Sequence, residues 1–168
     1  TALVLLKGLF WGSLGALAWT HVAYPAAAEL AARVRTRKVC KDEAAEPSVT
    51  VIIPAYNEEP VIERRLENLL ALDYPPGKLA IVVASDASSD RTNELVAAVA
   101  AREPRVRLLD CPRGGKVAAQ NRAVAGIDTP VVAFSDANCT WAPDALRNLV
   151  RNLADPAVAY VCGQLRLE

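Results

Sequence analysis

The chain has 168 residues, which is enough for one α/β domain of ordinary size and a short appendage. Its 19 basic side chains balance its 19 acidic ones, so the composition gives no support to a nucleic-acid partner. The 4 cysteines include no C-x-x-C pair, and the single histidine, His21, lies in an apolar stretch. We therefore expect free thiols, no zinc site and no histidine-assisted nucleophile.

The first 38 residues are predicted to form a membrane anchor with a basic flank. Residues 8–30 are mostly apolar, and about 20 such residues suffice for a helix to cross a bilayer. Basic side chains cluster between Arg33 and Lys41, whereas only Lys7 precedes the stretch. The positive-inside rule then places the residues after Arg33 in the cytoplasm, at a bacterial inner or plasma membrane. A signal peptide cleaved near residues 26–28 and an amphipathic surface helix are the alternatives.

Residues 39–48 are charged, contain a proline and are predicted to be a linker. After them, apolar β-branched runs alternate with helical segments. We expect strands at residues 49–54, 79–85, 105–109, 130–134, 158–162 and 164–167. We expect helices from a cap at Asn57 to about Leu72, from about Asp90 to Ala101, and at residues 116–125 and 143–153. The alternation predicts an α/β fold, a doubly wound and mostly parallel sheet with helices on both faces, over residues 49–168.

Polar clusters follow the first four predicted strands, at residues 54–59, 85–90, 113–116 and 135–138. Because the carboxyl ends of parallel strands share one edge of a sheet, we expect these clusters to meet there. Each cluster alone has a structural explanation, as a helix cap or a turn. Their common edge is what favours a binding site.

The chemistry of these clusters suits a nucleotide. Two glycines followed by Lys116 at a helix start suit a phosphate group, although neither a P-loop nor a G-x-G-x-x-G pattern is present. Asp86 can accept hydrogen bonds from a base or a ribose. Asp136 and Asn138 offer oxygen ligands for a hard divalent cation.

Four segments carry a resemblance to a known family: VTVIIPAYNEE (49–59), ASDASSD (84–90), RGGKVAAQNRAV (113–124) and FSDAN (134–138). In this order and spacing they resemble family-2 glycosyltransferases of the GT-A fold. The membrane-attached subgroup, similar to poly-N-acetylglucosamine, hyaluronan and cellulose synthases, is closest. The resemblance implies inverting transfer of a sugar from a nucleotide-diphosphate sugar, a UDP-sugar, to a saccharide or lipid acceptor in cell-envelope or exopolysaccharide synthesis.

The resemblance also implies roles for individual residues. The nucleotide-binding residues would be Pro54, Ala55, Tyr56, Glu58, Asp86, Ser88, Lys116, Asn121 and Asp136. Asp136 would also bind Mg²⁺ or Mn²⁺, together with Asn138, which stands where the family usually has a second acid. Ala87 stands where the family often has glycine, and we expect its backbone to avoid positive φ.

The family's general base and acceptor-binding motif lie downstream of the matching segments, so this chain alone is expected to be inactive in transfer. Asp144 and Asp155 are expected to be structural, in a first helical turn and in a chain turn. The alternatives are a non-catalytic or truncated nucleotide-binding module and a nucleotidyltransferase. A nucleotidyltransferase would require a basic, glycine-rich loop after the first strand, whereas residues 55–59 of this chain are acidic.

Overall fold

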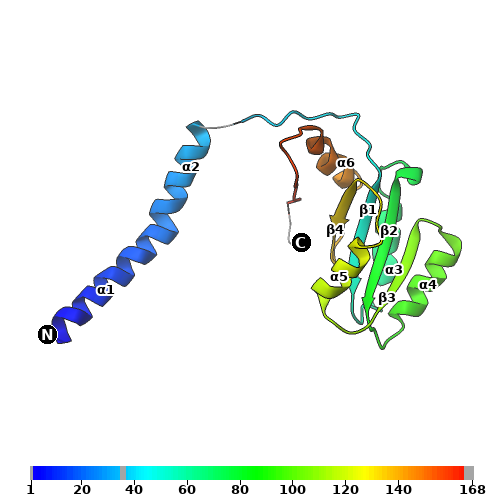
Figure 1. Cartoon of the computed structure of the whole chain (residues 1–168), viewed down its shortest axis with the longest axis horizontal. Helices are drawn as coiled ribbons and strands as arrows, with labels where there is room; N and C mark the ends of the chain where they lie inside the picture. Colours follow the sequence, from blue (N-terminus) through cyan, green and yellow to red (C-terminus); the bar gives the residue numbers. More distant parts are fainter. Residues whose placement is uncertain (1, 35–36, 165–168) are drawn as a thin grey trace. The chain divides into compact units, whose positions relative to one another are not determined.

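The computed structural model describes residues 2–34 and 37–164. The chain divides into two compact units, Thr1–Val39 and Cys40–Glu168 (Figure 1). The family-like motifs all belong to the second unit, and the apolar N-terminal stretch belongs to the first.

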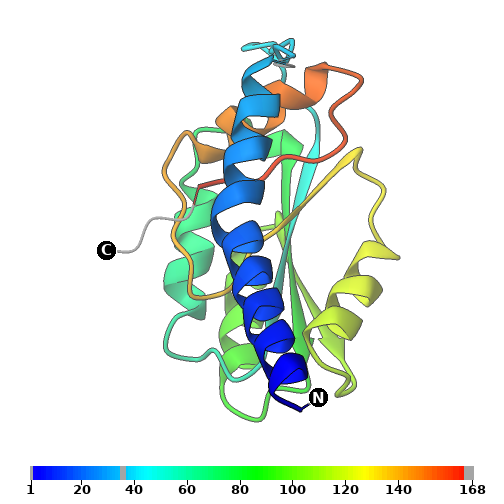
Figure 2. The same ribbon diagram turned by 90° about the vertical axis from the view of Figure 1, so that its left-hand side faces the viewer.

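In the first unit, residues 2–34 form one continuous helical rod, seen lengthwise in Figure 2. Helix α1 (Ala2–Ala18) passes through a π-helical turn, η1 (Trp19–Ala23), into α2 (Tyr24–Val34). Pro25 accounts for the π turn, because it lacks an N–H for the carbonyl four residues earlier. All described side chains of this rod are exposed, and over its 33 residues it is long and apolar enough to cross a membrane.

The second unit is built on a parallel sheet, as predicted, with four strands among the described residues. Its strands are β1 (Val49–Ala55), β2 (Leu79–Asp86), β3 (Val106–Cys111) and β4 (Val131–Phe134), in the order β3-β2-β1-β4. The β1 residue Val49 pairs with Leu79 on one side and Val131 on the other. All four carboxyl ends therefore lie at the same edge.

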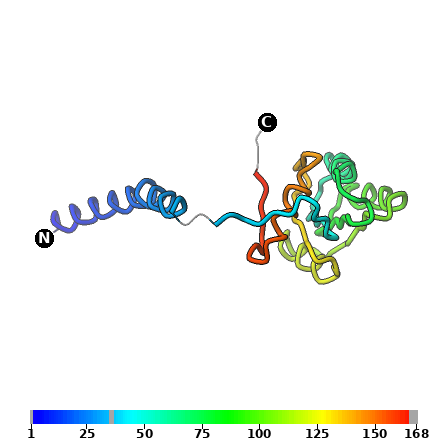
Figure 3. The backbone as a smooth tube through the Cα atoms, turned by 90° about the horizontal axis from the view of Figure 1, so that it is seen from above, coloured from blue at the N-terminus to red at the C-terminus, as the bar shows by residue number. Residues whose placement is uncertain are grey.

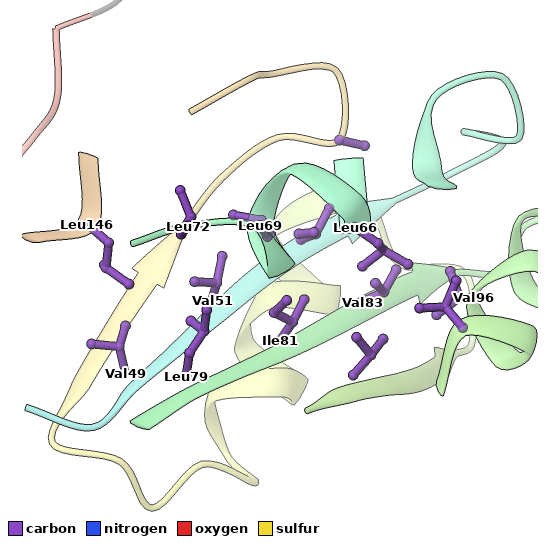
Figure 4. Packing of buried hydrophobic residues seen from close by; sticks show 14 of the residues in the cluster. Val49, Val51, Leu66, Leu69, Leu72, Leu79, Ile81, Val83, Val96 and Leu146 are labelled. Atoms are coloured by element: carbon purple, nitrogen blue, oxygen red, sulfur yellow. The ribbon is translucent and has the colours of Figure 1, made fainter. Parts of the chain in front are cut away.

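Helices cover both faces of this sheet, with α3 and α4 on the opposite side from α5 (Figure 3). The helices are α3 (Ile62–Leu70), α4 (Thr92–Arg102), α5 (Lys116–Val124) and α6 (Ala145–Val150), with short 3₁₀ turns η2 (Pro76–Lys78) and η3 (Arg151–Ala154). Alternate residues of β1 separate the two faces. Val51 packs in the larger core with Leu66, Val96 and Leu146 (Figure 4), and Ile52 packs against α5 on the other face.

Some predicted elements differ from those in the described residues. Asn57 does not cap a helix: α3 begins at Ile62, after a turn in which Glu58 O accepts the N–H groups of residues 61 and 62. Residues 158–162 form no strand, because a strand needs a paired neighbour, and Tyr160 is 81% exposed. Of the strand predicted at 164–167, Gln164 is irregular and the rest lies outside the described residues.

The charged segment before β1 is docked on the second unit. Glu46 pairs with Arg147 at 2.8 Å, and Glu43 pairs with Arg151 at 2.9 Å. The buried carboxylate of Asp155 accepts a hydrogen bond from the N–H of Cys40 at 3.2 Å. The two glutamates of this segment are thus paired with basic side chains of α6 and η3.

Candidate nucleotide-sugar site

The loops that follow β1 and β2 are joined to each other by hydrogen bonds. The N–H of Asn57 donates to Ser88 Oγ at 3.1 Å, and Asn57 Oδ1 accepts from the N–H of Ser89 at 2.8 Å. The N–H of Glu59 donates to Asp90 Oδ2 at 3.1 Å. The sequence motifs after the first two strands therefore form one continuous surface at the carboxyl edge of the sheet.

The hydrogen bonds between these two loops account for the backbone conformation of Asn57 and Ala87. The sequence predicts a helix cap at Asn57 and no positive φ at Ala87. Asn57 has φ 55° and Ala87 has φ 57°, so both lie in the left-handed region. The expectation that Ala87 avoids positive φ is wrong. The next residue, Ser88, is held by its Oγ, which also accepts a hydrogen bond from Ser85 Oγ at 2.9 Å, and this fixes the turn despite the methyl group of Ala87.

Asp86 lies at the end of β2 and is 3% exposed. Its carboxylate accepts the N–H of Gly114 at 2.7 Å and of Gly115 at 2.9 Å, and it pairs with Arg113 at 2.8 Å. The expectation that these glycine N–H groups face a phosphate is not met in this structure, because the carboxylate occupies them. Asp86 instead holds the loop that precedes Lys116.

The glycines in this loop are required by its geometry. Gly115 has φ 85°, which disfavours any L side chain, and a Cβ on Gly114 would lie 3.0 Å from the Cβ of Ala118. The loop ends where α5 begins, at Lys116. The two glycines therefore give Lys116 a defined position at the carboxyl edge of the sheet.

Arg113 is a site residue that the sequence reasoning did not single out. Its guanidinium lies over the ring of Tyr56, 3.5 Å from the ring centre, while it pairs with Asp86. Arg113 thereby joins two residues expected at the nucleobase. A basic residue directly before the glycine pair was the signal available in the sequence.

The loop after β4 brings the expected metal-binding residues to the same edge. Lys116 Nζ lies 2.5 Å from Asp136 Oδ1, with both side chains about half exposed. Asn138 is also exposed, whereas Ala137 between them is buried. Burial, followed by the charges of Asp136 and Asp90, raises the pKa of Glu58.

These donors fit a hard divalent cation only in part. Asp136 and Asn138 offer one carboxylate and one amide oxygen, both accessible. In the described part of the chain, no three His, Cys, Asp or Glu side chains gather as a metal cluster. A cation such as Mg²⁺ or Mn²⁺ would therefore take most of its ligands from a diphosphate and from water.

The remaining candidates are peripheral to these contacts. Pro54 and Ala55 end β1, and Ala55 is 2% exposed, so it can form a wall but offers no polar side chain. Asn121 lies exposed on α5, and the structure gives its side chain no hydrogen bond to the described loops. All 4 cysteines are free, as expected.

Comparison with known proteins shows the family of this chain. Residues 50–168 match the family described as glycosyl transferase family 2. An N-acetylglucosaminyltransferase of Rhizobium leguminosarum bv. trifolii is 33% identical over 127 residues, covering 74% of this chain and 70% of the relative. The probable glycosyltransferase YdaM of Bacillus subtilis (strain 168) is 34% identical, covering 72% of this chain and 30% of the relative.

Two solved structures share the fold. The mannosyltransferase PcManGT from Pyrobaculum calidifontis, in complex with GDP-Man and Mn²⁺, has a TM-score of 0.74 and 37% identity, covering 85% of this chain and 44% of that chain. S. aureus TarS 1-349 in complex with UDP-GlcNAc has a TM-score of 0.54 and 27% identity, covering 60% of this chain and 29% of that chain.

The parallel sheet and its likeness to solved glycosyltransferases define the GT-A fold. The chain belongs to glycosyl transferase family 2. The family and fold predicted from the four motifs are thus confirmed. The chain spans only 30% of the Bacillus relative and 44% of the mannosyltransferase.

Proposed function

We propose that this chain binds a nucleotide-diphosphate sugar, a UDP-sugar, for inverting transfer to a saccharide or lipid acceptor in cell-envelope or exopolysaccharide synthesis. The observation that carries the proposal is the contact between Lys116 and Asp136, which joins the loops after β3 and β4 at the carboxyl edge. Relatives named N-acetylglucosaminyltransferase and a relative named for succinoglycan biosynthesis support it.

In this proposal the exposed ring of Tyr56 and the guanidinium of Arg113 form the wall on which the base lies. The ammonium of Lys116 leaves Asp136 and pairs with the diphosphate. Asp136 and Asn138 would hold a divalent cation, which would neutralise negative charge on the departing nucleotide when bound. Both side chains are exposed on the loop, so this exchange needs no change in the core.

Transfer also requires a general base to deprotonate the acceptor hydroxyl. The four motifs supply donor-binding groups, and we assign none of their side chains to this step. We therefore propose donor binding as the role of residues 49–168 and no transfer by these 168 residues alone. A non-catalytic nucleotide-binding module is the alternative.

We further propose that residues 1–38 anchor the protein in a membrane, with the residues after Arg33 on the cytoplasmic side. The helical rod from Ala2 to Val34 supports an anchor by its length of 33 residues and its apolar composition. The basic side chains that follow support the orientation. Residues 39–48 would then connect the anchor to the donor-binding domain.

The test is a calorimetric titration of the full chain in detergent with UDP, and separately with GDP, with and without Mn²⁺. We expect UDP to bind, and Mn²⁺ to strengthen that binding. Lys116→Ala should weaken binding by about 1–3 kcal/mol, because it removes a charge-assisted bond to phosphate. Lys78→Ala is the matched control, since Lys78 precedes β2 at the other edge of the sheet and pairs with Glu46.

A folded protein that binds neither nucleotide would contradict the proposal. Preference for GDP over UDP would correct the donor and leave the site intact. Sugar transfer from UDP-sugar to an acceptor by a longer protein containing this chain would separate the enzyme from the non-catalytic module.

A further inference from the structure

The loop of residues 135–141, after β4, carries both proposed metal-binding side chains and contains no helix or strand. Its side chains alternate along the chain. Asp136 and Asn138 are exposed, whereas Ser135 is half-buried and Ala137 is 4% exposed. The outward face therefore offers ligand oxygens, and the inward face must supply whatever fixes the loop in place.

Two side chains from α3 reach the inward side of this loop. Asn68 makes two hydrogen bonds with the backbone of Trp141: its Nδ2 donates to the carbonyl and its Oδ1 accepts the N–H, both at 2.9 Å. Arg65 Nη2 donates to Ser135 Oγ at 2.7 Å, and Nη1 donates to Asn68 Oδ1 at 2.5 Å. The guanidinium also lies 5.2 Å from the centre of the Trp141 ring. Helix α3 thus holds the loop at both ends.

Arg65 is a costly side chain for this position. It is 2% exposed, and burial lowers its pKa to about 10. Within the described residues, no carboxylate lies at ion-pair distance from it, and its Nε has no hydrogen-bond partner. A buried charge without a carboxylate partner disfavours folding, and an apolar side chain would fill the same volume at lower cost. Packing gives no reason for a guanidinium here, whereas the bonds to the loop do.

We propose that Arg65 and Asn68 are positioning residues that hold the 135–141 loop so that Asp136 and Asn138 face the nucleotide and its cation. The proposal rests on the proposed function, because it assumes that a metal–nucleotide complex binds at this loop. Arg65 and Asn68 lie behind the loop and act through it. Groups that orient metal ligands in this way typically set metal affinity by about tenfold or more.

The test measures Mn²⁺ binding to the full chain saturated with UDP in detergent, followed by the electron paramagnetic resonance signal of free Mn²⁺. Arg65→Met and Ser135→Ala should each raise the Mn²⁺ dissociation constant, Arg65→Met by about tenfold. UDP affinity without metal should stay within about twofold of that of the unmodified chain. The residues proposed to contact the nucleobase and the loop that carries Lys116 are unchanged in these variants. Arg64→Met, on the exposed side of the same helix, is the control and should change neither.

The outcomes separate this proposal from the one on which it rests. If the unmodified chain binds no UDP, the proposed function fails. If it binds UDP and Mn²⁺, and folded Arg65→Met and Ser135→Ala proteins keep the same Mn²⁺ affinity, the positioning role is overturned. An equal loss of metal-free UDP affinity also overturns it, because that indicates general damage. Ser135→Ala removes only a hydroxyl, so it decides the question if Arg65→Met fails to fold.

Discussion

At the scale of single residues, Glu58 links stability to the proposed site. Its pKa is raised from 4.5 by burial and by Asp136 and Asp90. For a carboxyl with a raised pKa, the stabilising contribution is present below the unfolded pKa and is lost as pH rises through the folded pKa. Ionised Glu58 therefore destabilises the unliganded protein at neutral pH. A cation bound at Asp136 would relieve the repulsion between the carboxylates of Glu58 and Asp136.

We expect Glu58→Gln to raise the free energy of unfolding at about pH 7 and to leave it unchanged at about pH 4, where Glu58 is largely protonated. Urea denaturation at the two pH values measures this difference. Glu63→Gln, an equal change at an exposed position of α3, is the control. A lower stability of Glu58→Gln at neutral pH would show that the carboxylate makes a favourable contact instead.

Residue identities in the motifs were predictable, but their contacts were not. The sequence indicated that Asp86 and the glycine pair belong to one site, because their motifs end neighbouring strands. It did not indicate that the carboxylate would take the N–H groups of Gly114 and Gly115, since that depends on the three-dimensional approach of two loops. Arg65 was missed for the same reason: its burial follows from the loop that covers it.

At the scale of secondary structure elements, the docked segment before β1 depends on Asp155. This carboxylate is 3% exposed and accepts the N–H groups of Cys40 at 3.2 Å and Ala157 at 3.0 Å. The sequence predicts a structural role for Asp155 in a turn, and the hydrogen bond from the N–H of Ala157 is of that kind. The bond to Cys40 adds a contact across 115 residues of sequence.

We expect Asp155→Ala to lower the free energy of unfolding by about 1–3 kcal/mol, because it leaves N–H groups without an acceptor. Chemical denaturation followed by circular dichroism measures the loss. Asp128→Ala, at an exposed position, should stay within about 0.5 kcal/mol of the unmodified chain. Equal stabilities of the two variants would mean that water replaces Asp155 at no cost.

The elements themselves differ in how far the sequence determines them. The runs at β1 and β2 are continuous and β-branched, and strands buried on both faces need no other signal. The run at 158–162 is also apolar and partly β-branched, but it pairs with no strand among the described residues. Its composition alone therefore wrongly predicted a strand. The start of α3 was misplaced because the side chain of Asn57 bonds across to Ser89 rather than to its own helix.

At the scale of the whole molecule, the proposed membrane anchor would decide on which side of a membrane the proposed donor-binding domain works. Its 33 residues correspond to about 50 Å of helix, which exceeds the roughly 30 Å hydrocarbon core of a bilayer. The helix therefore has length to cross and still place the ion pair of Glu29 and Arg33 outside the apolar region. Under the proposed function the residues after Arg33 lie on the cytoplasmic side, so the second unit would face that side.

The native cysteines test this orientation. Cys40 and Cys162 are exposed on the second unit, whereas Cys111 is buried and burial raises the pKa of its thiol. In intact spheroplasts we expect a membrane-impermeant maleimide to leave the protein unlabelled, and after permeabilisation to label Cys40 and Cys162 well before Cys111. A Cys40→Ser, Cys162→Ser double variant should lose the fast labelling of the exposed thiols and keep only the slower labelling of the half-buried Cys139 and the buried Cys111. Labelling in intact spheroplasts would place the second unit outside the cytoplasm and remove it from the supply of nucleotide-sugar.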